Sequence, residues 1–266
     1  MSVFEAFLLG LLQGLTEFLP VSSSGHIVLG EYLLGINGSE NLMFTVMVHG
    51  ATVLSTLIVF RKDIMEILTG VLKFEDNEET RFFLYMLVSM VPVGIVGVFF
   101  KAGVETLFDG KIIFVASMLM VTGFLLAATN FIKPRTGTND LNYSKAFIIG
   151  LAQAFAVLPG ISRSGATIAT GLITGVNKKQ ATRFSFLMVI IPILGASLLQ
   201  VKDIMANPAI TGETSLAALA TGFFTALAFG ILACRWMISI VQKGKLIYFA
   251  TYCFVVATGV LIMQLF

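Results

Sequence analysis

The chain has 266 residues, of which 57% are hydrophobic and only 12% are charged, and its formal net charge is +2. Soluble proteins carry about 25% charged residues, so this composition excludes an ordinary soluble domain. It also argues against a nucleic-acid-binding protein and against a secreted scaffold held by disulfides. The mean hydropathy of +0.93 and the long uncharged runs predict an all-α, polytopic membrane protein.

Six apolar segments are long enough to cross a bilayer as helices, which takes about 20 residues. The predicted spans are residues 42–60, 82–100, 112–132, 184–200, 215–233 and 246–265.

Two further apolar regions, residues 3–36 and 143–175, are each interrupted by a polar turn. The first is broken by Pro20–His26, with the sequence P-V-S-S-S-G-H, and the second by Pro159–Gly165, with the sequence P-G-I-S-R-S-G. Broken polar backbone is tolerated at membrane depth only where protein or a water-filled cavity surrounds it. We therefore expect each region to form a re-entrant pair of half-helices that meet at the polar turn.

The two halves of the chain are similar to each other. A shift of 140 positions, without a gap, aligns fifteen identical residues between positions 6 and 64 and their counterparts, where this composition gives roughly five by chance. The chain is thus expected to be one membrane domain made of two repeats, residues 1–133 and 141–266, joined near Lys133–Asn142. Each repeat has three spans, an odd number, which predicts an inverted-topology repeat.

Basic residues are distributed unequally between the two predicted sides. The loops at 61–81, 133–145, 176–183 and 235–245 hold thirteen Lys and Arg residues, whereas the opposite side holds three. Because basic loops stay in the cytoplasm, both termini are predicted to be extracytoplasmic.

The remaining basic residue, Arg163, lies in the second polar turn. An arginine near the bilayer centre costs about 2.5–3.5 kcal/mol on the mildest scale, so a buried carboxylate or an anionic ligand should compensate it. The first repeat supplies Gln13 and Glu17, one helical turn apart on the same face.

The two turns carry groups that suit phosphate. The first contains Ser22, Ser23, Ser24 and His26, and the second contains Ser162, Arg163, Ser164, Gly165 and Thr167. Opposed helix N-termini, hydroxyl groups and a guanidinium together form an anion site. The spacing from Ser22 or Ser23 to His26 permits a hydroxyl nucleophile activated by the imidazole. Glu17 could orient His26, act as a base, or hold a divalent cation against phosphate oxygens. These groups predict phosphoryl transfer within the membrane, near its outer face.

Each of these features also has a purely structural interpretation. A serine-rich turn can be a helix cap, His26 can be a buried hydrogen-bonded residue, and Glu17 with Arg163 can be a salt bridge that closes the repeats. Ionisable residues inside a membrane usually mark functional sites, so the site hypothesis is favoured. For His49 we expect a contact with a facing helix and at most a minor role in the site.

Two segments resemble the undecaprenyl pyrophosphate phosphatase family of the bacitracin-resistance type. The segment Gln13–His26, Q-G-L-T-E-F-L-P-V-S-S-S-G-H, resembles the family's [E/Q]-x-x-x-E region. The segment Pro159–Thr167, P-G-I-S-R-S-G-A-T, resembles its P-G-x-S-R-S-x-x-T motif. Gln13 stands where many members carry Glu.

The resemblance implies an integral enzyme of the bacterial inner membrane that removes the terminal phosphate of undecaprenyl pyrophosphate. The product carries cell-wall precursors, and the activity confers bacitracin resistance. Family members depend on a divalent cation, here Mg²⁺ or Ca²⁺. The implied catalytic residues are Glu17, Ser23, His26 and Arg163, with Glu17 also the metal ligand. The implied substrate-binding residues are Gln13, Ser22, Ser24, Ser162, Ser164, Gly165 and Thr167. Ser22, His26 and water stay open as alternatives to Ser23 as the nucleophile.

Two other functions remain in competition. Inverted repeats with broken helices are also the layout of secondary transporters, so a transporter or a lipid-phosphate flippase is the main alternative. A phosphatase for shorter isoprenoid pyrophosphates is the other, because nothing in the sequence measures the lipid tail. The expected partners are a polyprenyl pyrophosphate and the bilayer, with no nucleic acid, and the apolar surfaces allow a homodimer.

Overall fold

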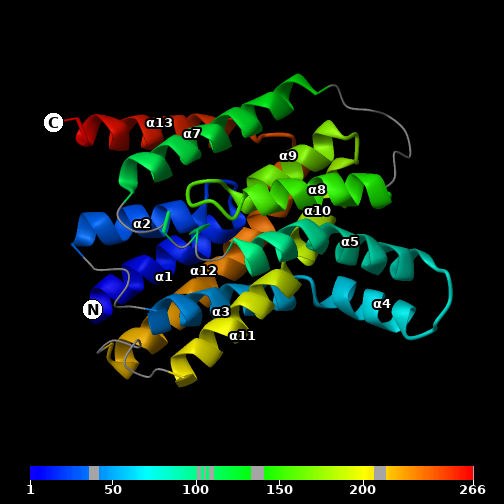
Figure 1. The fold of residues 1–266 in the computed structure, drawn as a ribbon, viewed down its shortest axis with the longest axis horizontal. Coiled ribbons are helices and arrows are strands. Elements are labelled where there is room, and N and C mark those ends of the chain that lie inside the picture. Colours follow the sequence, from blue (N-terminus) through cyan, green and yellow to red (C-terminus); the bar gives the residue numbers. More distant parts are fainter. Residues whose placement is uncertain are drawn as a thin grey trace.

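A computed structural model describes residues 1–35, 42–100, 103–104, 106–107, 111–132, 141–206 and 214–265. The regular elements in these residues are all helical, which agrees with the predicted fold class (Figure 1). They are α1 (Val3–Phe18), α2 (Ser23–Leu34), α3 (Leu42–Val59), α4 (Arg61–Val71), α5 (Glu78–Phe99), α7 (Ile112–Ala128), η2 (Thr129–Phe131), α8 (Tyr143–Phe155), α9 (Arg163–Ile173), α10 (Lys178–Met188), α11 (Ile190–Ala206), α12 (Leu216–Gln242) and α13 (Ile247–Met263). The predicted join between the repeats lies mostly outside the described residues.

Several helices have the length and composition of membrane spans. Within the described residues, four stretches qualify, namely Glu78–Phe99, Ile112–Phe131, Lys178–Leu199 and Leu216–Gln242. A fifth arises if α3 and α4, which are bent by 74° relative to each other, count as one span. α13 is apolar but shorter, with 17 residues. The chain is thus a multi-pass membrane protein.

Three expectations about secondary structure were wrong in detail. The predicted span 215–233 continues as α12 to Gln242, through most of the predicted loop 235–245. The predicted loop 61–81 begins with a helix, α4, because Ile64, Ile67 and Val71 follow a helical period and Ile67 is buried. The predicted span 184–200 starts earlier, at Lys178, and is interrupted at Val189. Pro192 explains the interruption, because it has no N–H to donate to the carbonyl of Met188.

Small residues bring α1 close to α12, and this contact positions the end of α1. A methyl group added at Gly10 would lie 2.6 Å from the carbonyl oxygen of Gly222, and one added at Gly14 would lie 2.7 Å from that of Ala226. Both helices therefore present small residues four positions apart, a common way for membrane helices to approach closely.

The second repeat packs in a similar way. α8 lies against α5 as α1 lies against α12, and a methyl group at Gly150 would meet the backbone carbonyl of Ser89. Gly150 is the counterpart of Gly10 in the repeat alignment. Figure 1 shows both termini at one end of the molecule and α4 at the other end.

Candidate active site

The two polar turns touch each other near the middle of the molecule (Figure 1). A methyl group at Gly25 would lie 3.0 Å from the Cα of Gly160, and one at Gly165 would lie 3.3 Å from the Cβ of Pro20. Gly25 and Gly165 are equivalent in the repeat alignment, as are Pro20 and Gly160. The two contacts are therefore counterparts of each other, as expected for turns related by a two-fold axis.

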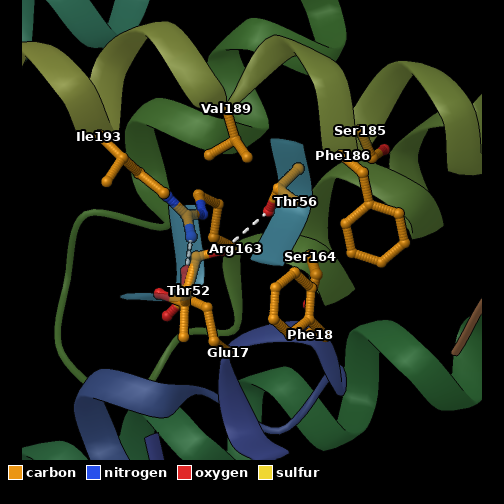
Figure 2. A pocket seen from close by; sticks show the side chains of 10 residues that line it. All are labelled: Glu17, Phe18, Thr52, Thr56, Arg163, Ser164, Ser185, Phe186, Val189 and Ile193. Carbon is orange, nitrogen blue, oxygen red and sulfur yellow. Dashed lines mark hydrogen bonds and ion pairs between the residues drawn. The ribbon is translucent and has the colours of Figure 1, made fainter. Parts of the chain in front are cut away.

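The Glu17 carboxylate, at the end of α1, lies at this junction. It accepts hydrogen bonds from Gln13 Nε2 at 3.1 Å and from Ser23 Oγ at 2.6 Å, both at Oε2. Arg163 NH2, from the second turn, donates to the other oxygen, Oε1, and forms an ion pair with it. Figure 2 shows the two charged side chains pointing toward each other. The predicted compensation of Arg163 by a carboxylate is confirmed.

The first residues of α2 and α9 are capped in the same way. Ser22 Oγ accepts from the N–H of Gly25 at 3.2 Å, and Ser162 Oγ accepts from the N–H of Gly165 at 3.0 Å. The hydroxyl of each cap also lies 3.3 Å from that of the serine two residues later, Ser24 or Ser164. The helix-cap interpretation is therefore correct for Ser22 and Ser162. The residue after each cap, Ser23 or Arg163, instead bonds to Glu17.

A threonine on α7 that the sequence analysis missed holds the second turn in place. Thr122 Oγ1 donates to the carbonyl of Gly160 and accepts from the N–H of Ser162, both at 2.9 Å. Thr122 is 1% exposed. Its only signal in the sequence is a hydroxyl residue within a largely apolar span.

His26 has different partners from those the spacing suggested. Its Nδ1 lies 2.9 Å from the carbonyl oxygen of Ser22, and its Nε2 lies 2.9 Å from the hydroxyl of Tyr252 on α13. The expected pairing of the imidazole with a serine hydroxyl is not among its contacts, since the Ser23 hydroxyl bonds to Glu17. A backbone carbonyl four residues earlier lies on the same helix face as the hydroxyls, so spacing alone could not distinguish these partners.

A small, open cleft adjoins the ion pair. Of the predicted site residues, Glu17, Arg163 and Ser164 line it (Figure 2). Gln13, Ser22, Ser162 and Thr167 are buried and do not line it. The hydroxyl of Thr167 bonds to the carbonyl of Arg163 at 2.9 Å within its own helix.

Three further hydroxyl residues line the cleft. Thr52 and Thr56 come from α3 and Ser185 from α10. His49 lies one turn before Thr52 on α3, with its Nδ1 2.8 Å from the carbonyl oxygen of Thr45. The signal for this face of α3 was the helical spacing of His49, Thr52 and Thr56 within an apolar span.

The site holds one acidic residue, which restricts how it could bind a metal. Within the part of the chain that the structure describes, no group of three or more His, Cys, Asp or Glu residues is arranged to hold a metal ion. The Gln13 amide, however, donates from Nε2 to Glu17 and keeps its Oε1 atom buried without a hydrogen-bond partner. One carboxylate and one amide oxygen, completed by substrate phosphates and water, fit the coordination that Mg²⁺ prefers.

The chain is similar to known proteins over nearly its whole length. The chain is 54% identical over 264 residues to an undecaprenyl-diphosphatase of Bacteroides fragilis, covering 99% of both chains. It is 53% identical to an undecaprenyl-diphosphatase of Bacteroides thetaiotaomicron over the whole of both chains. A relative with the same description from Salinibacter ruber is 42% identical over 96% of this chain and 97% of its own. Residues 6–259 match the family described as bacitracin resistance protein BacA, and the chain belongs to that family.

Proposed function

We propose that the chain is an undecaprenyl-diphosphatase, which hydrolyses undecaprenyl pyrophosphate to undecaprenyl phosphate and orthophosphate and thereby gives resistance to bacitracin. The observation that carries this assignment is the convergence of Ser23 and Arg163 on the Glu17 carboxylate. The identity of 54% to an enzyme of this description supports it over the whole length of the chain.

Arg163 and the two helix N-termini bind the pyrophosphate. A guanidinium pairs well with phosphate oxygens, and the free N–H groups in the first turns of α2 and α9 favour anions. The Arg163 side chain is 27% exposed where it lines the cleft, so it can reach a phosphate there while the Glu17 side chain stays buried.

Ser23 attacks the terminal phosphorus while Glu17 Oε2 accepts the hydroxyl proton. The bond from phosphorus to the bridging oxygen breaks, and undecaprenyl phosphate leaves. Water then hydrolyses the phosphoserine, which releases orthophosphate and regenerates Ser23. The short contact from Ser23 Oγ to Glu17 supports this role for Ser23. Direct attack by water on the substrate is the alternative route, and His26 acts by positioning the turn.

Glu17 and Gln13 Oε1 would hold the divalent cation, Mg²⁺ or Ca²⁺, together with the substrate. When bound, the cation would neutralise phosphate charge as it develops. The buried, unpartnered amide oxygen of Gln13 supports this site.

The proposal includes the full membrane topology. Six spans and two re-entrant pairs form an inverted repeat, with both termini and the active site toward the outer face of the bacterial inner membrane. The matching contacts of the two turns support the inverted repeat, and the thirteen basic residues on the opposite side support the orientation. A homodimer, which the apolar outer faces allow, is checked by the molar mass of the purified protein in detergent.

The test is orthophosphate release from C55 pyrophosphate by the purified protein in detergent, with and without chelator. We expect release by the wild-type chain and its loss with chelator. A secondary transporter or flippase, the other candidate suggested by the paired broken helices, would release no phosphate in detergent, because there are no compartments to transport between. A parallel assay with shorter isoprenoid pyrophosphates measures tail selectivity.

A further inference from the structure

The backbone of Ser22 adopts a conformation that residues other than glycine rarely adopt. Its φ is +69° and its ψ is +94°. Within the described residues, Phe74 is the other non-glycine residue with a positive φ. Such a conformation is unfavourable and persists only when surrounding contacts hold it. Ser22 directly precedes Ser23, so its backbone decides where the Ser23 hydroxyl points.

His26 supplies two hydrogen bonds to the carbonyl of Ser22. The backbone N–H of His26 donates to it at 3.0 Å, and Nδ1 of the imidazole lies 2.9 Å from it. Since a carbonyl only accepts, Nδ1 carries the proton. In the neutral ring, Nε2 is then an acceptor.

Tyr252, from the last helix of the other repeat, donates to that acceptor. Its hydroxyl lies 2.9 Å from His26 Nε2, and the two rings stack with their centroids 5.6 Å apart at an interplanar angle of 12°. The neighbouring Cys253 contacts the same turn, with its Sγ 3.9 Å from the carbonyl oxygen of Pro20. α13 thus braces the first turn at two points.

The second turn serves as an internal comparison. Ser162, the counterpart of Ser22, has an ordinary extended conformation with φ −74° and ψ 116°. The second turn is followed by Ala166, which occupies the position equivalent to His26 in the repeat alignment. The imidazole is therefore present only in the turn whose serine has the unfavourable backbone conformation.

We propose that Tyr252 is a positioning residue for the reaction. Through His26 it holds the Ser22 backbone so that the Ser23 hydroxyl is directed at Glu17. Tyr252 does not contact the Ser23–Glu17–Arg163 group itself. This inference rests on the proposed function, because it assumes that Ser23 takes part in phosphate release.

The first test compares Tyr252→Phe with Tyr248→Phe in detergent-solubilised full-length protein. The first variant keeps the stacked ring and removes the hydroxyl, whereas the second removes an exposed hydroxyl one turn earlier on α13. With C55 pyrophosphate we expect kcat of Tyr252→Phe to fall about tenfold or more with KM little changed, because positioning of a reacting group acts on the transition state. Tyr248→Phe should match the wild type. An unchanged kcat in Tyr252→Phe would overturn the proposal.

A double-mutant cycle separates action through His26 from an independent effect. If Tyr252 acts through His26, the double variant His26→Ala/Tyr252→Phe should be as slow as His26→Ala alone. If the two losses in kcat multiply instead, Tyr252 acts by another route and the proposal fails.

A spectroscopic measurement keeps this test separate from the proposed activity. The chain has two histidines, so ¹⁵N-histidine labelling of a His49→Gln background reports His26 alone. We expect the Nε2 resonance to shift in Tyr252→Phe and to stay in place in Tyr248→Phe. If the wild type releases no phosphate, the proposed function is refuted. The His26 Nε2 resonance would then still report whether Tyr252 contacts His26. An unshifted resonance in Tyr252→Phe would refute the contact itself.

Discussion

The guanidinium of Arg163 and the carboxylate of Glu17, which lie 146 residues apart in the chain, pair across the junction of the two turns. One carboxylate oxygen, Oε1, accepts from Arg163, and the other, Oε2, accepts from Ser23 and Gln13. A salt bridge that only closed the repeats would be a weak source of stability and would not require a hydroxyl on the same carboxylate. The pairing therefore supports a site in which a charged pair and a serine hydroxyl are held together.

Removing the Ser23 hydroxyl should abolish most of the activity. Ser23→Ala leaves Glu17 without the proton donor of the proposed first step, and we expect kcat to fall about 100-fold or more. Ser117→Ala is the control, since that exposed hydroxyl bonds to its own helix on α7. Rapid acid quenching followed by phosphopeptide mapping should locate a phosphoserine at residue 23 of the wild type. Unchanged release by Ser23→Ala would exclude it as the nucleophile.

Replacing Gln13 by glutamate should strengthen cation binding. The substitution places a second carboxylate beside Glu17, and hard divalent cations bind more tightly as carboxylate ligands are added. We expect Gln13→Glu to need less Mg²⁺ or Ca²⁺ for half-maximal phosphate release, and Gln13→Ala to need more. Isothermal titration with the cation gives the same order without turnover. Equal cation requirements in all three proteins would argue against a metal site at this position.

Close packing of α1 on α12 should tolerate no added methyl group. Gly14→Ala would place Cβ 2.7 Å from a backbone oxygen on α12, and overpacking of this kind costs about 1–3 kcal/mol. Gly94→Ala is the matched control, because nothing lies within 4 Å of its added Cβ and alanine favours a helix. Thermal unfolding in detergent should show a lower Tm for Gly14→Ala only. A Tm that is unchanged in both variants would contradict the close approach.

The Thr122 hydroxyl should be necessary for the conformation of the second turn. Thr122→Val keeps the shape of the side chain and removes both hydrogen bonds to the turn, which leaves the buried N–H of Ser162 unpaired at a cost of about 1–3 kcal/mol. Because Arg163 follows Ser162 directly, phosphate release should fall together with Tm. Thr106→Val, at an exposed threonine that bonds only to a nearby carbonyl, should leave both quantities unchanged. Full activity in Thr122→Val would show that α7 does not hold the turn.

Much of the architecture could be predicted because the membrane restricts what a sequence can do. Polar turns such as Pro20–His26 must be surrounded by protein or water at that depth, and Arg163 must find a compensating charge. The contact of the turns and the partner of Arg163 could therefore be anticipated from composition, spacing and the internal repeat.

Other features depended on contacts that leave no local pattern. Tyr252 lies 226 residues from His26, and no neighbouring residue distinguishes it from other tyrosines in apolar segments. The sequence did not indicate that α4 is a helix, because its charged residues resemble those of a solvated loop. Two of them, Asp63 and Glu66, pair with Arg183. Tertiary ion pairs and packing fix such elements, and a single sequence does not display them.

The central claim is that the ion pair between the two turns is part of a phosphatase site, and Arg163 tests it most directly. Orthophosphate release from C55 pyrophosphate is measured for the wild type, Arg163→Ala and Arg163→Lys. The control is Arg81→Ala, which breaks an exposed ion pair with Asp76. We expect Arg163→Ala to lose about 100-fold or more in kcat/KM, Arg163→Lys to retain a small fraction because it lacks the planar fork, and Arg81→Ala to match the wild type. Wild-type release by folded Arg163→Ala would contradict the account.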